Sequence, residues 1–96
     1  MNATSNKSRT PLHQAAQNGQ LKAVNILLNN KAEVDAREND GWTPLHLAVH
    51  NGHIDVVDIF VKMIAKVYIM DGKGLTVLHI AALKGHAEVT EMLLKK

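Results

Sequence analysis

The chain has 96 residues, of which 46% are hydrophobic but only 3% aromatic, and it contains no cysteine. This length suffices for one domain with an aliphatic core, whereas a disulfide framework, a cysteine-ligated metal and a cysteine nucleophile are excluded. The net charge is +2, and its positive surplus lies at the two ends, so the clustered basic face of a nucleic-acid ligand site is not expected. The first element is a polar N-terminal arm over residues 1–8. It lacks the apolar stretch of a secretory leader, which predicts a cytoplasmic or nuclear protein.

An internal repeat dominates the remainder of the chain. Thr-Pro-Leu-His at 10–13 returns at 43–46, and Thr-Val-Leu-His follows at 76–79. An alanine and a glycine recur at the same step in each copy: Ala15, Ala48 and Ala81, then Gly19, Gly52 and Gly85. Because internal self-similarity of this length indicates a repeat architecture, we expect one repeat domain over 9–96. Its units cover about 10–42, 43–75 and 76–96, and the third ends before a return segment.

Each unit has the pattern of two short helices joined by a tight turn. In the second unit Thr43 is a suitable N-cap, and the proline after it occupies the position where a helix tolerates proline best. We expect a first helix over Leu45–Asn51, ended by Gly52 in the left-handed conformation. A second helix is expected over Ile54–Lys62, whose apolar residues follow the helical period. The segment 31–42 contains a turn signal and returns the chain to the next unit.

This pattern resembles the ankyrin repeat, whose signature is T-P-L-H-x-A on a 33-residue period. The resemblance extends from Asn6 to Lys96. It implies an all-α fold, an ankyrin-repeat solenoid of stacked helix-turn-helix units joined by hairpin-like loops. It also implies that the signature histidine has a structural role, bonding backbone groups that tie adjacent units together. In proteins that look like this one, a partner is bound on a concave face formed by the loop tips and the first helices.

Mapping that concave face onto this chain predicts a partner-binding stripe. The stripe comprises Arg9, Gln17, Asn18, Asn39, Asp40, Trp42, His50, Asn51, Lys73, Leu75, Leu83 and Lys84, together with Asn6 and Lys7. Trp42 is the one large aromatic residue of the stripe, and such residues are frequent anchors of interfaces. The alternative is that Trp42 covers the junction between two repeats, and the residue pattern leaves both interpretations open.

The six histidines are the best material for chemistry, and they do not form a convincing site. His46, His50 and His53 have helical spacing, but Gly52 interrupts the helix, and no further ligand stands at zinc-site spacing. No serine is paired with a histidine and an acid, and no phosphate-binding glycine loop is present. We therefore expect no enzyme activity, no metal and no cofactor.

The segment Met63–Met70 departs most from the ankyrin pattern, because apolar residues replace small or polar ones. Its apolar members are Ile64, Tyr68, Ile69 and Met70. In one interpretation the loop repacks against its neighbours. In a second it is an exposed patch that binds a partner or a second copy, since exposed apolar surface usually marks interaction. In a third the helix continues from Ile54 through Met70; its charged residues then argue against a membrane span.

The sequence thus predicts a non-catalytic protein–protein interaction module that binds another protein on its concave face, without nucleic acid or membrane as a ligand. The alternative is a structural or assembly element that self-associates, or packs within a larger protein, through the apolar segment 63–70. The identity of the partner is not encoded, because ankyrin surfaces have no transferable code.

Overall fold

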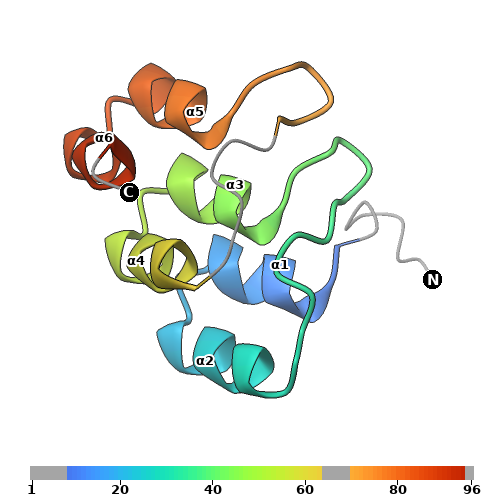
Figure 1. Ribbon diagram of the computed structural model, residues 1–96. Coiled ribbons are helices and arrows are strands. Elements are labelled where there is room, and N and C mark those ends of the chain that lie inside the picture. The colour runs from blue at the N-terminus through green and yellow to red at the C-terminus, as the bar shows by residue number, and fades with distance from the viewer. Residues whose placement is uncertain (1–8, 64–69, 95–96) are drawn as a thin grey trace.

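The computed structural model describes residues 9–63 and 70–94. In these ranges the chain forms six α-helices and no strand: α1 (Pro11–Gln17), α2 (Leu21–Asn29), α3 (Pro44–His50), α4 (Ile54–Lys62), α5 (Val77–Lys84) and α6 (Ala87–Leu94). Figure 1 shows the first helices α1, α3 and α5 stacked in one layer and the second helices α2, α4 and α6 in another. The expected all-α solenoid of helix-turn-helix units is confirmed.

The first helix of each unit begins at a threonine because that threonine and a histidine cap each other. In α3, the hydroxyl of Thr43 accepts a hydrogen bond from the amide of His46 (3.3 Å), and Nδ1 of His46 accepts one from the amide of Thr43 (3.0 Å). The same reciprocal pair begins α1 and α5. A glutamate or glutamine usually completes such a box, and here the signature histidine takes its place. The structural role expected for this histidine therefore starts with helix initiation.

The turn between the two helices of a unit depends on glycine and on a histidine from the next unit. Gly19, Gly52 and Gly85 have φ of +67°, +68° and +71°, a region that costs other L-residues energy. The ring of His53 packs on Gly19, where an added Cβ would lie 2.7 Å from Nδ1. The ring of His86 packs on Gly52 in the same way, at 2.9 Å from Cε1. The glycine is thus needed both for its backbone conformation and for close packing of the next repeat.

Replacing Gly52 by alanine is expected to destabilise the protein more than replacing Gly85. Both positions impose a positive φ, which should cost about 1–2 kcal/mol. Only at Gly52 does the new methyl group also displace the ring of His86, whose Nε2 donates to the carbonyl of His50 (3.0 Å); losing that bond should add about 1 kcal/mol. Urea unfolding of the two variants measures the difference. Equal losses would contradict the packing role of the histidine.

The core lies between the two helix layers and is almost entirely aliphatic. Phe60 in α4 is its one phenylalanine and is fully buried at the centre of the stack. Val24 and Val57 hold equivalent positions in α2 and α4, and both are fully buried. Alanines such as Ala48 line the first helices (α1, α3 and α5, the inner helices) where neighbouring units approach closely. The low aromatic content is consistent with these short distances between stacked helices.

Helix α4 ends at Lys62, and this corrects one of the three interpretations of the apolar segment. Met63 follows the helix with ψ of −143°, which is not helical, so a helix from Ile54 through Met70 is wrong. Residues 64–69 lie outside the described residues, and with them the predicted patch members Ile64, Tyr68 and Ile69. Met70 is described and is 53% exposed.

The return loops are closed by backbone hydrogen bonds and lie against each other. The amide of Glu38 donates to the carbonyl of Trp42 (2.9 Å), and that of Asp71 donates to Leu75 (2.8 Å). Neighbouring loops are joined where the amide of Gly72 donates to the carbonyl of Asp40 (2.8 Å). The loops are therefore hairpin-like, as expected, and form a continuous edge that projects from the inner helices (Figure 1).

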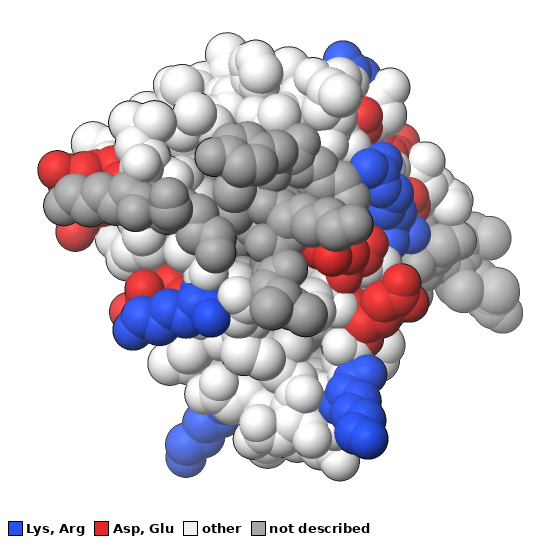
Figure 2. All heavy atoms as spheres, viewed as in Figure 1, with Lys and Arg blue, Asp and Glu red and all other residues white. Residues whose placement is uncertain are grey.

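Charged side chains are dispersed over the face of the molecule shown in Figure 2, where Lys and Arg are separated from one another by uncharged or acidic residues. One ion pair on the second helices joins Lys62 and Asp58 (3.1 Å). Among the helices described, none combines the length and apolar character that crossing a membrane would require.

Candidate functional site

A buried carboxylate anchors each return loop to a donor that lies 29 residues earlier in the chain. Glu38 and Asp71 hold the same position in successive repeats and are only 5% and 7% exposed. Glu38 accepts from Nε of Arg9 (3.1 Å), and Asp71 accepts from the indole nitrogen of Trp42 (2.8 Å). Because Arg9 and Trp42 are also one repeat period apart, the same long-range bond is made twice with different chemistry. Sequence reasoning missed both acids, although the repeat register could have paired them with their donors.

Each carboxylate also organises its own loop. Asp71 accepts hydrogen bonds from the amides of Lys73 (2.8 Å) and Leu75 (2.9 Å), and Glu38 accepts one from the amide of Asp40 (2.8 Å). Burial acts to raise the pKa of Asp71. The amides of Leu75 and Lys73 and the indole of Trp42 outweigh that effect, so its pKa lies below its ordinary 3.8. Asp71 is therefore held as an anion that fixes the loop.

Trp42 lies at the junction between the first and second repeats. Its indole stacks on the ring of His46 (5.8 Å between centroids) and is tilted against that of His50 (5.3 Å). Its carbonyl receives a hydrogen bond from Nε2 of His13 in the first repeat (2.8 Å), while its indole nitrogen binds Asp71 before the third. These contacts support the junction-covering interpretation of Trp42. Its use as a partner anchor stays a prediction.

The environment of His13 requires a neutral imidazole. Nδ1 accepts from the amide of Thr10 (3.1 Å), so Nε2 carries the proton and donates to the carbonyl of Trp42. Burial lowers the pKa of His13 below its ordinary 6.5, although the bond to Trp42 and the carboxylate of Glu38 oppose this. A second proton on the ring would remove an acceptor from the helix cap.

Lowering the pH below 6.5 is expected to destabilise the fold. The unfolded chain protonates His13 near 6.5 and the folded chain does so only at lower pH, so the unfolded state binds more protons between the two values. The contribution of His13 to stability is complete above pH 6.5 and falls as the pH drops through it. Thermal midpoints between pH 8 and pH 5 measure the loss. A His13→Asn variant should lose less over this range, and an unchanged slope would assign the effect to other groups.

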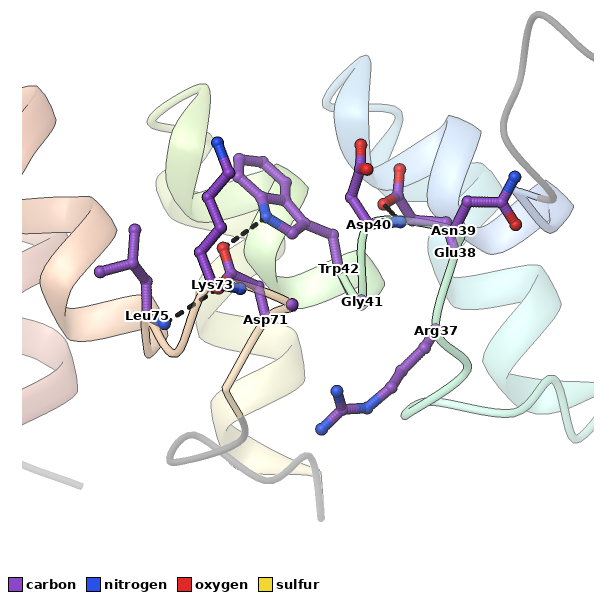
Figure 3. A pocket seen from close by; sticks show the side chains of 10 residues that line it. Arg37, Glu38, Asn39, Asp40, Gly41, Trp42, Asp71, Lys73 and Leu75 are labelled. Carbon is purple, nitrogen blue, oxygen red and sulfur yellow. Dashed lines mark hydrogen bonds between the residues drawn. The ribbon is translucent and has the colours of Figure 1, made fainter.

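Two hollows lie beside Trp42. Both are lined by Trp42, Asp40 and Glu38. The helix-side hollow, of about 290 Å³, contains six residues of the predicted stripe: Arg9, Gln17, Asp40, Trp42, His50 and Asn51. The loop-side hollow, of about 610 Å³, contains five: Asn39, Asp40, Trp42, Lys73 and Leu75. Figure 3 shows the side chains of Asp40, Trp42 and Lys73 extending to the same side of the loops, and that of Arg37 extending to the other.

The structure describes twelve of the fourteen predicted stripe residues and brings nine of them to these two hollows. Asn18, Leu83 and Lys84 are exposed but line neither hollow. Asn6 and Lys7 lie outside the described residues. The stripe missed Arg37 and Leu47, which line the loop-side and helix-side hollows respectively.

The histidines considered as metal ligands have separate structural contacts. His46 caps α3 and stacks under Trp42, whereas Nε2 of His53 donates to the carbonyl of Gln17 (2.8 Å). In the part of the chain that is described, no three side chains of the metal-binding types converge. The residues around Trp42 form hollows with an aromatic surface and charges of both signs, which are features suited to binding a partner.

The comparisons with known proteins agree with the fold. The family model described as "Ankyrin repeats (3 copies)" matches residues 1–71, and the model described as "Ankyrin repeat" matches residues 73–96. Together they extend over nearly the whole chain. No curated protein matches it.

Proposed function

Because the chain belongs to the ankyrin repeat family, we propose that it is a non-catalytic module that binds a partner protein across the two hollows beside Trp42. Ankyrin repeats are generally protein–protein interaction modules, and the family is generally non-catalytic. The observation that supports this site is the convergence of stripe residues from different repeats on one edge. Trp42 and Asp40 belong to both hollows, so a single partner segment lying there would contact the helix side and the loop side together.

Hydrogen bonds hold the loops of the proposed surface, which favours binding. Asp71 and Glu38 accept bonds from backbone amides of their own loops and from Trp42 and Arg9, 29 residues earlier in the chain. Such preorganisation reduces the ordering entropy lost on association. The exposed charge of Lys73 would then select a partner by complementary charge, while the half-buried Trp42 and Leu75 supply apolar contact.

Charge reversal at an exposed lysine tests this proposal without disturbing the core. Partners are first captured with the intact protein and identified by mass spectrometry. Lys73→Glu should weaken binding by about tenfold, equivalent to about 1.4 kcal/mol. Lys22→Glu is the matched control, since Lys22 is also an exposed lysine, on α2, and lines neither hollow. Equal effects of the two changes, or none at Lys73, would contradict the proposed face.

The second candidate function is assembly through the apolar segment 63–70. It is supported by the exposure of Met63 and Met70, the two ends of that segment. Under this proposal the chain self-associates at high micromolar concentration in sedimentation experiments, and Ile69→Asp restores the monomer. A strictly monomeric protein at these concentrations would exclude self-association through this segment.

A further inference from the structure

A histidine of each of the second and third repeats donates a hydrogen bond to a carbonyl of the repeat before it. The third carbonyl of this series receives no such bond among the described residues. Nε2 of His53 donates to the carbonyl of Gln17 (2.8 Å), and Nε2 of His86 donates to that of His50 (3.0 Å). The two carbonyls lie at the ends of α1 and α3, in equivalent positions of their repeats. Leu83 holds the third position of this series. Among the described residues, no histidine of a following repeat bonds to it.

The glycine beneath each imidazole leads to the same conclusion. Gly19 and Gly52 are covered by the rings of His53 and His86, whereas among the described residues only the chain neighbours of Gly85 approach within 4 Å of a Cβ placed on it. Gly85 nevertheless keeps the left-handed conformation of the other two. The C-terminal face of the third repeat therefore has the form of an internal repeat interface.

Apolar side chains at this face are exposed where their counterparts are buried. Ala16 and Val49 have no exposed surface, but the equivalent Ala82 is exposed. Val61 is 9% exposed, and its counterpart Leu94 is 67% exposed. Ala82 and Leu94 line one groove of about 540 Å³ between α5 and α6. In the first two repeats the equivalent positions are covered by the neighbouring repeat, as expected in a stack of repeats.

The N-terminal face of the same molecule differs in chemistry. Gln14 stands where the second and third repeats have Leu47 and Ile80, both of which are almost completely buried. Terminal repeats need a polar outer face, and the first repeat has such a residue. The groove of the third repeat presents the exposed Ala82 and Leu94, although Thr90 there replaces the fully buried Val24 and Val57. The C-terminal face therefore keeps exposed apolar side chains beside one polar substitution.

We propose that the groove between α5 and α6 is a stacking surface for a further helix pair of the same repeat chemistry. The incoming pair places a leucine or isoleucine against Ala82, and its imidazole lies over Gly85 and donates to the carbonyl of Leu83. This occupant is argued from continuity with the two internal interfaces. A second copy docked groove to groove fits less well, because Glu88 and Glu91 line the groove and would face their own counterparts.

The third repeat also determines which kind of residue the loop of the docking unit can carry at the position of Glu38 and Asp71. Arg9 and Trp42 each donate to a buried acid in the next loop, but their counterpart in the third repeat is Leu75, which has no side-chain donor. An acid at the position of Glu38 and Asp71 would be buried there without that donor, which is costly. The docking unit is therefore expected to carry a neutral residue at this position.

An extended chain tests the proposal. A copy of residues 31–62 appended after Lys96 continues the repeat register, and Glu38→Asn within the copy meets the requirement set by Leu75. The matched control carries Leu47→Gln and His53→Gln in the copy, which are the residues of the first repeat at these positions. The thermal midpoint of the extended chain should exceed those of the wild type and the control by at least about 5 °C. Equal midpoints in all three would overturn the proposal.

A change on the receiving face completes the test. Ala82→Glu should remove the gain of the extended chain and leave the midpoint of the unextended chain nearly unchanged, because Ala82 is exposed there. A gain that persists in Ala82→Glu would overturn the proposal. Sedimentation of the unextended chain decides between occupants: it should be unaffected by Ala82→Glu. A dimer that this change dissociates would assign the groove to a second copy and overturn the stated occupant.

Discussion

Replacing Phe60 by alanine is expected to lower the free energy of unfolding by about 3–5 kcal/mol. Phe60 is fully buried where α4 faces the inner helices, at the middle of a stack of three units. Its removal leaves a cavity that neighbouring repeats cannot fill without moving. Small domains have only about 5–15 kcal/mol of stability in total, so the variant should be marginally folded at 25 °C. Urea unfolding followed by circular dichroism measures the loss.

The repeat register supplies the control for this prediction. Leu27 and Leu93 take the position of Phe60 in the other units, so Phe60→Leu should be accommodated for less than about 1.5 kcal/mol. If Phe60→Leu were as damaging as Phe60→Ala, the second repeat would need the aromatic ring itself. A small effect of both changes would place Phe60 outside the cooperative core.

Replacing Trp42 by alanine is expected to lower stability by about 2–4 kcal/mol. The change removes a half-buried ring that stacks on His46 and also the donor to the buried carboxylate of Asp71. The thermal midpoint should fall by roughly 10 °C or more for a domain of this size. Loss of partner binding in this variant would therefore not by itself identify Trp42 as an anchor.

Trp42→Phe separates the two contributions. It keeps an aromatic ring at the junction but removes the hydrogen bond to Asp71, so it should cost about 1–3 kcal/mol, less than alanine does. A Trp42→Ala variant that melts with the wild type and fails to bind its partner would contradict the junction-covering role. That result would restore Trp42 as a dedicated binding residue.

The local parts of the fold were predictable because their causes lie within a few residues. Thr43 and His46 cap the same turn of helix, and Gly52 ends that helix by its own conformation. The observed α4 has the predicted bounds, and α3 begins and ends one residue earlier than expected. Most of the predicted stripe also converges, since repeats in register place equivalent positions side by side.

The repeated sequence by itself determined the helix pairs, because they follow from short-range chemistry copied three times. The resemblance to the ankyrin repeat added the solenoid fold and the candidate edge of the molecule. Only the tertiary structure decided that Glu38 and Asp71 are buried anchors and that Trp42 closes a junction. The donors of both acids lie 29 residues earlier in the chain, and such bonds exist only once neighbouring repeats have stacked. The same stacking buries Ala16 completely, whereas Ala82, which holds the equivalent position in the third repeat, is exposed.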